Sequence, residues 1–347
     1  MKTILTLTMS FFICVGCQPS TPAQSDAQPA EPAAKKEASS LVIYSGRSQV
    51  LVGGLVEAFE KSTGIKVDVR YDKSTQTLAN RIATEGKATE ADLFFAQDSG
   101  YLGALSAKGL LAALPQETLT KVPQTNQDKL GRWVATSGRA RVLVYDPKTV
   151  TPAELPKSLS QLGDSKWKGK LGWAPGNASF QAHISALRHL WGEEETKKWM
   201  QSVMQNAEPK VYPKNSPQVR GVSNGEIQVG WVNHYYLHKL KSANPELSAA
   251  NYSFTDEKDA GNLMMLSGVG IVAASDAPAE ALKFVDFLLA PEQQAYFTNK
   301  VFEYPVREGV ALNPALPDLR GKLVTIEQTH LADLEPTLQL LRDLNLQ

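Results

Sequence analysis

Hydrophobic positions after residue 40 follow two periods in turn. Residues 41–44 and 91–96 are short apolar runs, and residues 65–71 alternate between apolar and polar side chains; all three patterns predict β-strands. Between these segments, apolar residues recur one helical turn apart over residues 51–59 and 78–82, which predicts two helices, the first of them ending at Gly64. Strands that alternate with helices in this way predict an α/β fold with a mostly parallel sheet.

The same alternation continues in the second half of the chain. The pattern predicts further strands at residues 141–145, 171–175, 227–232 and 266–272, and further helices at residues 180–191, 194–204, 276–289 and 334–341. Ligands of open α/β sheets bind beyond the carboxyl ends of the strands. We therefore expect a binding site near the strand ends at Tyr44, Ala96, Pro175 and Val232.

Length, charge and cysteine content exclude several classes of protein. The chain has 347 residues, which is more than a single hydrophobic core usually serves, so two lobes are expected. Its 36 basic and 36 acidic residues are scattered and balance to a net charge of zero, so no nucleic-acid partner is expected. Both cysteines, Cys14 and Cys17, lie near the N-terminus, which excludes a zinc finger, an iron–sulfur cluster or a thiol enzyme in the body of the chain.

The N-terminus predicts an export signal. Lys2 precedes an apolar stretch over residues 4–15 that is too short to span a bilayer. This stretch runs into Val15, Gly16 and Cys17, and small residues before a cysteine resemble the cleavage box of bacterial lipoproteins. We therefore predict a lipoprotein signal peptide at residues 1–17, a lipid on Cys17, and a location in the periplasm or at the cell surface. Simple secretion is the alternative.

Residues 18–40 are predicted to form a flexible tether. They contain several prolines and alanines but no aromatic residue and no valine, isoleucine or leucine. Such a segment cannot bury enough apolar surface to offset the entropy lost on ordering. It would hold a soluble body close to a membrane that the protein touches only through its lipid anchor.

Two adjacent tyrosines, Tyr235 and Tyr236, follow the strand predicted at residues 227–232, where a helix is expected to begin. A phenol is often a core residue, but a phenolate is a hard anionic oxygen ligand that suits hard, highly charged cations. Two such ligands at an element boundary of an exported chain suggest a site for ferric iron, Fe(3+).

At this point the chain resembles the periplasmic ferric-iron binding proteins, the iron(III)-type solute-binding proteins of ABC importers. The resemblance covers almost the whole body. It rests on residues 43–47 (IYSGR), 59–67 (FEKSTGIKV), 91–98 (ADLFFAQD), 137–142 (SGRARV), 172–175 (GWAP), 212–215 (YPKN), 233–236 (NHYY) and 302–305 (FEYP). The last tyrosine pair, joined to the upstream Tyr-Pro-Lys-Asn, is its most specific part.

The resemblance implies a type II-like periplasmic-binding-protein fold of two α/β lobes joined by crossing hinge strands. The first lobe would comprise residues 41–140 and about 266–316, and the second about 141–265 and 317–347. Such a protein is no enzyme. It captures ferric iron as a monomer and delivers it to the permease of an ABC importer in the inner membrane.

The resemblance also implies roles for single residues. Tyr235 and Tyr236 correspond to the iron-binding tyrosines of the family. Where members of the family carry a histidine and a glutamate, this chain has Ser48 and Gln97, so Gln97 is expected to supply only a neutral oxygen to the metal. The implied site for a synergistic anion, carbonate or phosphate, comprises Asn215, Asn233, Ser179 and Arg141. Short polar donors near helix starts suit such an anion.

Several alternatives stay open at this level. The same fold could bind another solute, such as an oxyanion, a polyamine or a thiamine-like cation, because a fold does not fix its ligand. His234 and His238 lie four residues apart, so on one helix they would share a face and could hold zinc in a secreted metalloenzyme. Arg141 could orient Asp98 instead of binding an anion, and Arg47 could replace the charge of the absent histidine.

Overall fold

The computed structural model describes residues 40–208, 210–319 and 321–346. The predicted signal peptide, the lipid on Cys17 and all but the last residue of the tether lie outside this range. No helix in the described part of the chain combines the length and the apolar character needed to cross a membrane.

The strands belong to one nine-stranded sheet, whose main order is β2-β1-β3-β8-β4-β6-β5, with β7 and β9 both paired to β4. Their bounds are β1 Ser40–Ser45, β2 Lys66–Tyr71, β3 Leu93–Ala96, β4 Val134–Tyr145, β5 Leu171–Gly172, β6 Val229–Asn233, β7 Ala250–Tyr252, β8 Met264–Ile271 and β9 Tyr304–Pro305. Six of the predicted strands are thus observed within a few residues of their expected bounds.

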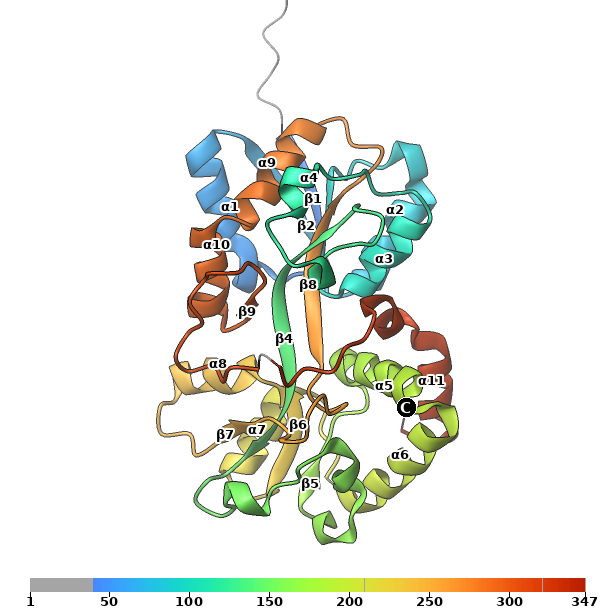
Figure 1. The fold of residues 1–347 in the computed structure, drawn as a ribbon, viewed down its shortest axis with the longest axis vertical. Helices are drawn as coiled ribbons and strands as arrows, with labels where there is room; N and C mark the ends of the chain where they lie inside the picture. The colour runs from blue at the N-terminus through green and yellow to red at the C-terminus, as the bar shows by residue number, and fades with distance from the viewer. Residues whose placement is uncertain (1–39, 209, 320, 347) are drawn as a thin grey trace, which may run out of the picture. The chain divides into compact units, whose positions relative to one another are not determined.

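Helices flank the sheet (Figure 1). Their bounds are α1 Gln49–Thr63, α2 Thr75–Glu85, α3 Ser99–Ala107, α4 Gln116–Leu119, α5 Ala178–Trp191, α6 Glu193–Ala207, α7 Asn215–Ser223, α8 Tyr235–Ala243, α9 Pro278–Leu288, α10 Pro291–Tyr296 and α11 Leu334–Asp343, with a short 3-10 helix, η7, at Gln328–Ala332. Helix α1 ends as predicted at Gly64, whose φ of 73° needs a residue without a Cβ atom.

Parallel pairing joins β1 to β2 and β3, and β5 to β6. The long strands β4 and β8 instead pair antiparallel with each other and with their neighbours, so the sheet is mixed where a mostly parallel one was expected. Residues 134–140 of β4 pair with β8, and residues 141–145 pair with β6. Figure 1 shows both long strands running between two groups of helices.

The buried apolar residues form separate clusters along this sheet. The largest draws on residues 41–135 and 266–306. Two others draw on residues 140–260 and on C-terminal residues. The lobe boundaries expected from the sequence follow a similar division and stay a prediction.

Candidate functional site

The two tyrosines lie where β6 turns into α8. Tyr235 and Tyr236 are the first two residues of that helix. Their rings stack with centroids 4.3 Å apart and an interplanar angle of 28°. Tyr235 is only 5% exposed, whereas Tyr236 is half-buried. Stacked rings bring the two phenol groups to one place, as a shared ligand requires.

The surroundings of Tyr235 keep its phenol protonated in the absence of a ligand. Burial raises its pKa well above 10, and Tyr236 raises it further, while the positive charge of Arg139 acts in the opposite direction. The first turn of a helix also favours an anion, because the helix dipole is positive there. Burial therefore disfavours a free phenolate, and only a highly charged cation bound to the oxygen would displace the phenol proton.

His234 immediately precedes helix α8, and backbone hydrogen bonds occupy both of its ring nitrogens, so neither is free to bind a metal ion. Its Nε2 atom lies 2.7 Å from the carbonyl oxygen of Phe302, to which it donates. Its Nδ1 atom accepts a hydrogen bond of 3.1 Å from the backbone N–H of Ala140. Burial lowers the pKa of His234 to about 4, so the ring is neutral at physiological pH. These contacts give His234 a structural role.

The four residues expected to bind an anion lie together. The Nη1 atom of Arg141 lies 3.1 Å from Oδ1 of Asn233, 3.4 Å from Oδ1 of Asn215 and 3.5 Å from Oγ of Ser179. Asn177 joins the group, because its Oδ1 accepts hydrogen bonds from Ser179 and Asn215. The asparagines and the serine lie at the starts of α5 and α7 and at the end of β6, and the fold brings these three points to Arg141 on β4.

Arg141 is the buried charge of this group. It is 1% exposed, and its guanidinium stacks over the ring of Trp231 at 4.9 Å. Burial lowers the pKa of Arg141 to about 9, although the neighbouring Tyr236 and Tyr235 act to raise it. The group therefore remains a cation at neutral pH, and no carboxylate pairs with it within the described residues. An uncompensated buried cation favours a bound anion.

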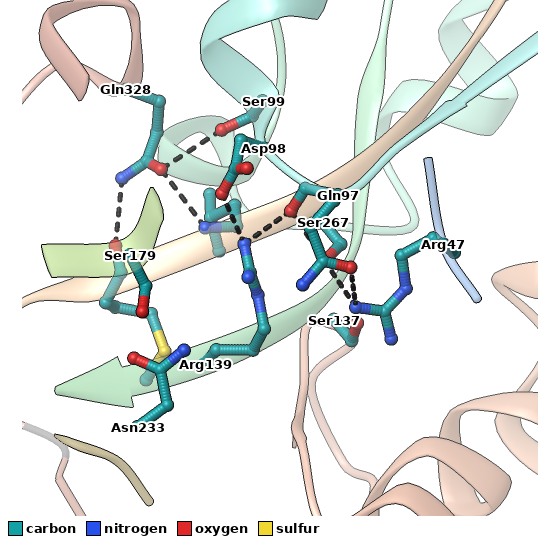
Figure 2. Close-up of polar contacts among 12 residues, drawn as sticks. Arg47, Gln97, Asp98, Ser99, Ser137, Arg139, Ser179, Asn233, Ser267 and Gln328 are labelled. Carbon is teal, nitrogen blue, oxygen red and sulfur yellow. Dashed lines mark hydrogen bonds and ion pairs between the residues drawn. The ribbon is translucent and has the colours of Figure 1, made fainter. Parts of the chain in front are cut away.

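Arg139, rather than Arg141, holds Asp98. Its Nη2 atom lies 2.7 Å from Oδ1 of Asp98 and also donates to the backbone oxygen of Gln97 (Figure 2). Burial would lower the pKa of Arg139, but the carboxylates of Asp98 and Glu303 outweigh it, so the pKa is raised. The interpretation that Arg141 orients Asp98 is therefore wrong, because the side chain two residues earlier on β4 occupies that position.

Gln97 is part of a second buried network. Its Oε1 atom accepts a hydrogen bond of 2.8 Å from Nη1 of Arg47. Arg47 also forms an ion pair of 2.8 Å with Glu303, and neither side chain is exposed. Ser137 and Ser267 complete the network through hydrogen bonds to Glu303 and Arg47. The oxygen expected to face a metal ion thus faces a guanidinium.

Ser48 lies just before α1, and Lys239 lies on α8. Ser48 is exposed and precedes α1 without capping it through its side chain. The Nζ atom of Lys239 lies 5.7 Å from the ring centroid of Tyr235. Burial lowers the pKa of Lys239, the carboxylate of Glu303 acts to raise it, and Arg47 acts to lower it.

The structure gives no support to a zinc enzyme. The rings of His234 and His238 are 6.4 Å apart, and the His234 nitrogens bind backbone groups. Across residues 40–208, 210–319 and 321–346, no three His, Cys, Asp or Glu side chains form a group that could hold a metal ion.

Sequence reasoning missed Glu303 and Lys239. Glu303 lies in the Phe-Glu-Tyr-Pro segment that carries part of the resemblance, but its partner Arg47 is 256 residues away in the chain. Lys239 follows Tyr235 by four residues, which is one helical turn, so its position over that ring could have been read from the spacing.

Comparisons with known proteins agree with this geometry. A family model described as bacterial extracellular solute-binding protein matches residues 88–324. The Fe(3+)-binding periplasmic protein of Serratia marcescens is 34% identical over 283 residues, which cover 81% of this chain and 82% of that protein. The major ferric iron-binding protein of Neisseria meningitidis is 33% identical over 273 residues, which cover 78% of this chain and 82% of that protein.

A solved structure shares the fold as well. Iron-bound HitA from Pseudomonas aeruginosa aligns with a TM-score of 0.81 and 32% identity, over 88% of this chain and 99% of that chain. This similarity confirms the predicted two-lobed α/β fold.

Proposed function

Because the chain belongs to the bacterial extracellular solute-binding proteins, we propose that it captures ferric iron in the periplasm and delivers it to the permease of an ABC importer. Members of this family are transport components and not enzymes. The two relatives described above are named for ferric iron, and the HitA structure is described as iron-bound, which disfavours another solute, such as a polyamine or a thiamine-like cation.

Tyr235 and Tyr236 supply the metal ligands in this proposal. The single observation that carries it is the stacking of the two rings at the start of α8. Arg139 lies close enough to lower the pKa of Tyr235, and both tyrosines lie close enough to raise the pKa of Arg141. Ferric iron is hard and tripositive, and it displaces the phenol protons as other metal ions displace thiol protons. If the two rings were purely structural, the buried charge of Arg141 would have no counter-charge among the described residues, because only Arg139 is paired with a carboxylate.

The group around Arg141 holds the anion that completes the metal site. Arg141, Asn215, Asn233 and Ser179 offer donors from four elements, and a carbonate or phosphate ion bound there would neutralise the buried guanidinium. Helices α5 and α7 begin at this point, which further favours negative charge.

Delivery requires a change of conformation. Tyr235 is too buried to meet iron from solution as it stands, so the halves of the sheet joined by β4 and β8 open for capture and close afterwards. Iron shifts this balance only by binding the closed form more tightly. A lipid on Cys17 and the following tether would keep a monomeric receptor near the membrane.

The test uses the colour of ferric phenolates. Purified protein given ferric iron is expected to develop a visible charge-transfer absorption, and the Tyr235→Phe and Tyr236→Phe double variant is expected to lose it. Tyr212→Phe is the matched control, because the hydroxyl of Tyr212 bonds Glu226, outside the site. A wild-type protein that binds no iron, or a double variant that keeps the colour, overturns the proposal.

A further inference from the structure

A short segment near the C-terminus lies between the two groups of helices. This segment is η7, Gln328–Ala332, and is here called the C-terminal strap. It contacts α3, whose leucines belong to one apolar cluster, and α5, whose apolar residues belong mainly to another. Figure 1 shows the red strap, just before α11, between these two helices. The strap therefore joins parts of the protein that have separate cores.

The strap is tied to α3 and to the long strand β8 by one amide. The Oε1 atom of Gln328 accepts hydrogen bonds of 3.1 Å from Oγ of Ser99 and from the backbone N–H of Leu266 (Figure 2). The Nε2 atom of Gln328 donates to the carbonyl oxygen of Met264 at 3.1 Å. Three hydrogen bonds thus hold the strap on this side.

The contact between the strap and α5 is of a different kind. The ring of His330 stacks on the ring of His189, with centroids 3.8 Å apart and an interplanar angle of 24°. Leu331 packs in a small apolar cluster that includes Ala182 and Ala186 of α5. This side of the strap therefore depends on one aromatic pair and a small apolar contact.

Asp333, the residue after the strap, is held by α5 directly. Its carbonyl oxygen accepts a hydrogen bond of 2.9 Å from Oγ of Ser185 and one of 3.1 Å from Nη1 of Arg188. Helix α11, which follows Asp333, packs on the same helix. When the two groups of helices move apart, the strap can stay with α3 only if His330 separates from His189.

Five charged side chains lie around the histidine pair. They are Lys129 before β4, Arg188 at the end of α5, Glu193 at the start of α6, and Glu327 and Asp333 on either side of the strap. Lys129 pairs with Glu327 at 2.5 Å. Arg188 pairs with Glu193 at 2.6 Å. Oδ2 of Asp333 lies 3.4 Å from Nε2 of His189 and 3.4 Å from Nη1 of Arg188. Because three carboxylates stand against two fixed cations, one protonated imidazole is balanced and a second is not.

The second proton is therefore the one that the stacked pair resists. Burial lowers the pKa of His330, and the charges of His189 and Lys129 lower it further, while Glu327 and Asp333 act to raise it. A free imidazole has a pKa of about 6.5. Below that pH a strap detached from α5, with its rings apart, binds more protons than an attached one. The attachment is therefore fully favourable above about pH 6.5 and weakens as the pH falls.

From this geometry we propose that the C-terminal strap is a latch between the two groups of helices, and that mild acid releases it. At neutral pH the stacked rings of His189 and His330 hold the strap to α5. Protonation of both rings separates them, the strap stays with α3 through Gln328, and the helices around α5 become free to move away. This device goes beyond the proposed function and acts in the protein without bound iron.

Hydrogen exchange tests the release. The iron-free full chain, with Cys14→Ser and Cys17→Ser so that no thiol remains, is the parent protein. The amides of residues 327–333 are followed at pH 7.5 and 5.5, with correction for the direct effect of pH on exchange. We expect their protection in the parent to fall at least about threefold at pH 5.5, since the detached strap binds an additional proton.

Three variants separate titration from packing. His330→Phe and His189→Phe each keep an aromatic pair but remove one titrating ring, so strap protection should fall less than in the parent. Asp333→Asn removes the balancing carboxylate and keeps the backbone carbonyl, so the fall should be larger. Residues 49–63 of α1 contain no histidine, and their exchange should respond to pH equally in all four proteins.

A distance measurement tests whether the strap restrains the two groups of helices. Spin labels are placed on the exposed positions of Lys108→Cys, after α3, and Glu195→Cys, on α6. We expect the distance between the labels to increase at pH 5.5 in the parent and to stay constant in the same protein carrying His330→Phe.

Each outcome decides one part of the proposal. Equal protection of the parent strap at the two pH values, or an equal fall in the parent and in both phenylalanine variants, overturns release by acid. A strap that loses protection while the label distance stays constant overturns its role as a latch. Neither result affects iron capture, which the colour test decides separately.

Discussion

The Nη2 atom of Arg47 lies 2.8 Å from Oε2 of Glu303, and neither side chain is exposed to solvent. This pair joins the segment after β1 to the segment before β9. It also sets the orientation of Gln97, because the same guanidinium donates to the Gln97 oxygen. The ion pair is thus part of the fold and part of the site.

Breaking this pair should destabilise the protein strongly. In Glu303→Gln the Arg47 charge stays buried without a counter-charge, which costs about 3 kcal/mol or more. Urea unfolding of wild type and Glu303→Gln measures the difference in their free energies of unfolding. The control is Glu90→Gln, which breaks an exposed pair with Arg70 and should change the stability by less than about 1 kcal/mol. Equal effects of the two substitutions would contradict the prediction.

Folding stability should fall in mild acid because of His183. This ring is fully buried, with Nε2 2.7 Å from the carbonyl oxygen of Ala260. Burial lowers its pKa to about 3, with a further decrease from the charge of Arg141. The unfolded chain binds a proton below about pH 6.5 and the folded chain does not. The contribution of His183 to stability is therefore present above about pH 6.5 and is lost as the pH falls toward 3.

The size of this effect follows from linkage. Below about pH 6.5 His183 should reduce the free energy of unfolding by about 1.4 kcal/mol per pH unit. Urea titrations between pH 7.5 and 5 should show a smaller slope for His183→Gln than for wild type. Above pH 7, where the histidine is neutral in both states, the two stabilities should run parallel. If wild type and His183→Gln showed the same dependence of stability on pH below 6.5, the prediction that His183 causes it would be wrong.

Iron binding should weaken as the pH falls. Burial raises the pKa of Tyr235, so its phenol is protonated before iron binds, and binding releases the proton. If both phenols release one proton each, the apparent affinity should fall about 100-fold for each unit of decreasing pH. Competition with a chelator of known affinity between pH 8 and 6 measures this slope. A pH-independent affinity would exclude phenolate ligands.

Two helical glycines should respond in opposite ways to alanine. A Cβ atom on Gly100 in α3 would lie 2.4 Å from the Cβ of Ala332 in η7, so Gly100→Ala should cost about 1–3 kcal/mol. On Gly53 in α1 it would meet only the flexible side chain of Gln49 at 3.3 Å. Gly53→Ala should therefore stabilise the protein by about 0.5–1 kcal/mol through helix propensity. Thermal unfolding measures the stability of both variants. A Gly100→Ala protein more stable than wild type would show that η7 moves to make room for the added methyl group.

Local patterns predicted much of the fold. The cap at Gly64 and the start of a helix at Tyr235 follow from turn chemistry and periodicity, and both are observed. Strand β4 was predicted only from Arg141 onward, because Ser137, Gly138 and Arg139 are polar or small. They nevertheless belong to the strand, because their backbone pairs with β8. The side chains of Ser137 and Arg139 form hydrogen bonds with Glu303 and Asp98.

The sequence also predicted only part of the site. The anion group could be predicted because its polar residues stand at element ends, where the fold collects them. The partners of Arg47 and Arg139 could not, because each pair joins segments far apart in the chain and several arginines were available for each carboxylate.

Strand β4 carries Arg139 and Arg141 two positions apart, and side chains two positions apart on a strand share a face. One guanidinium holds Asp98 and the other meets the asparagines of the anion group. A deletion of one residue upstream within this strand would turn both guanidiniums to the opposite side at once. Among relatives, insertions and deletions should therefore be absent from this strand, or should change its length by an even number of residues.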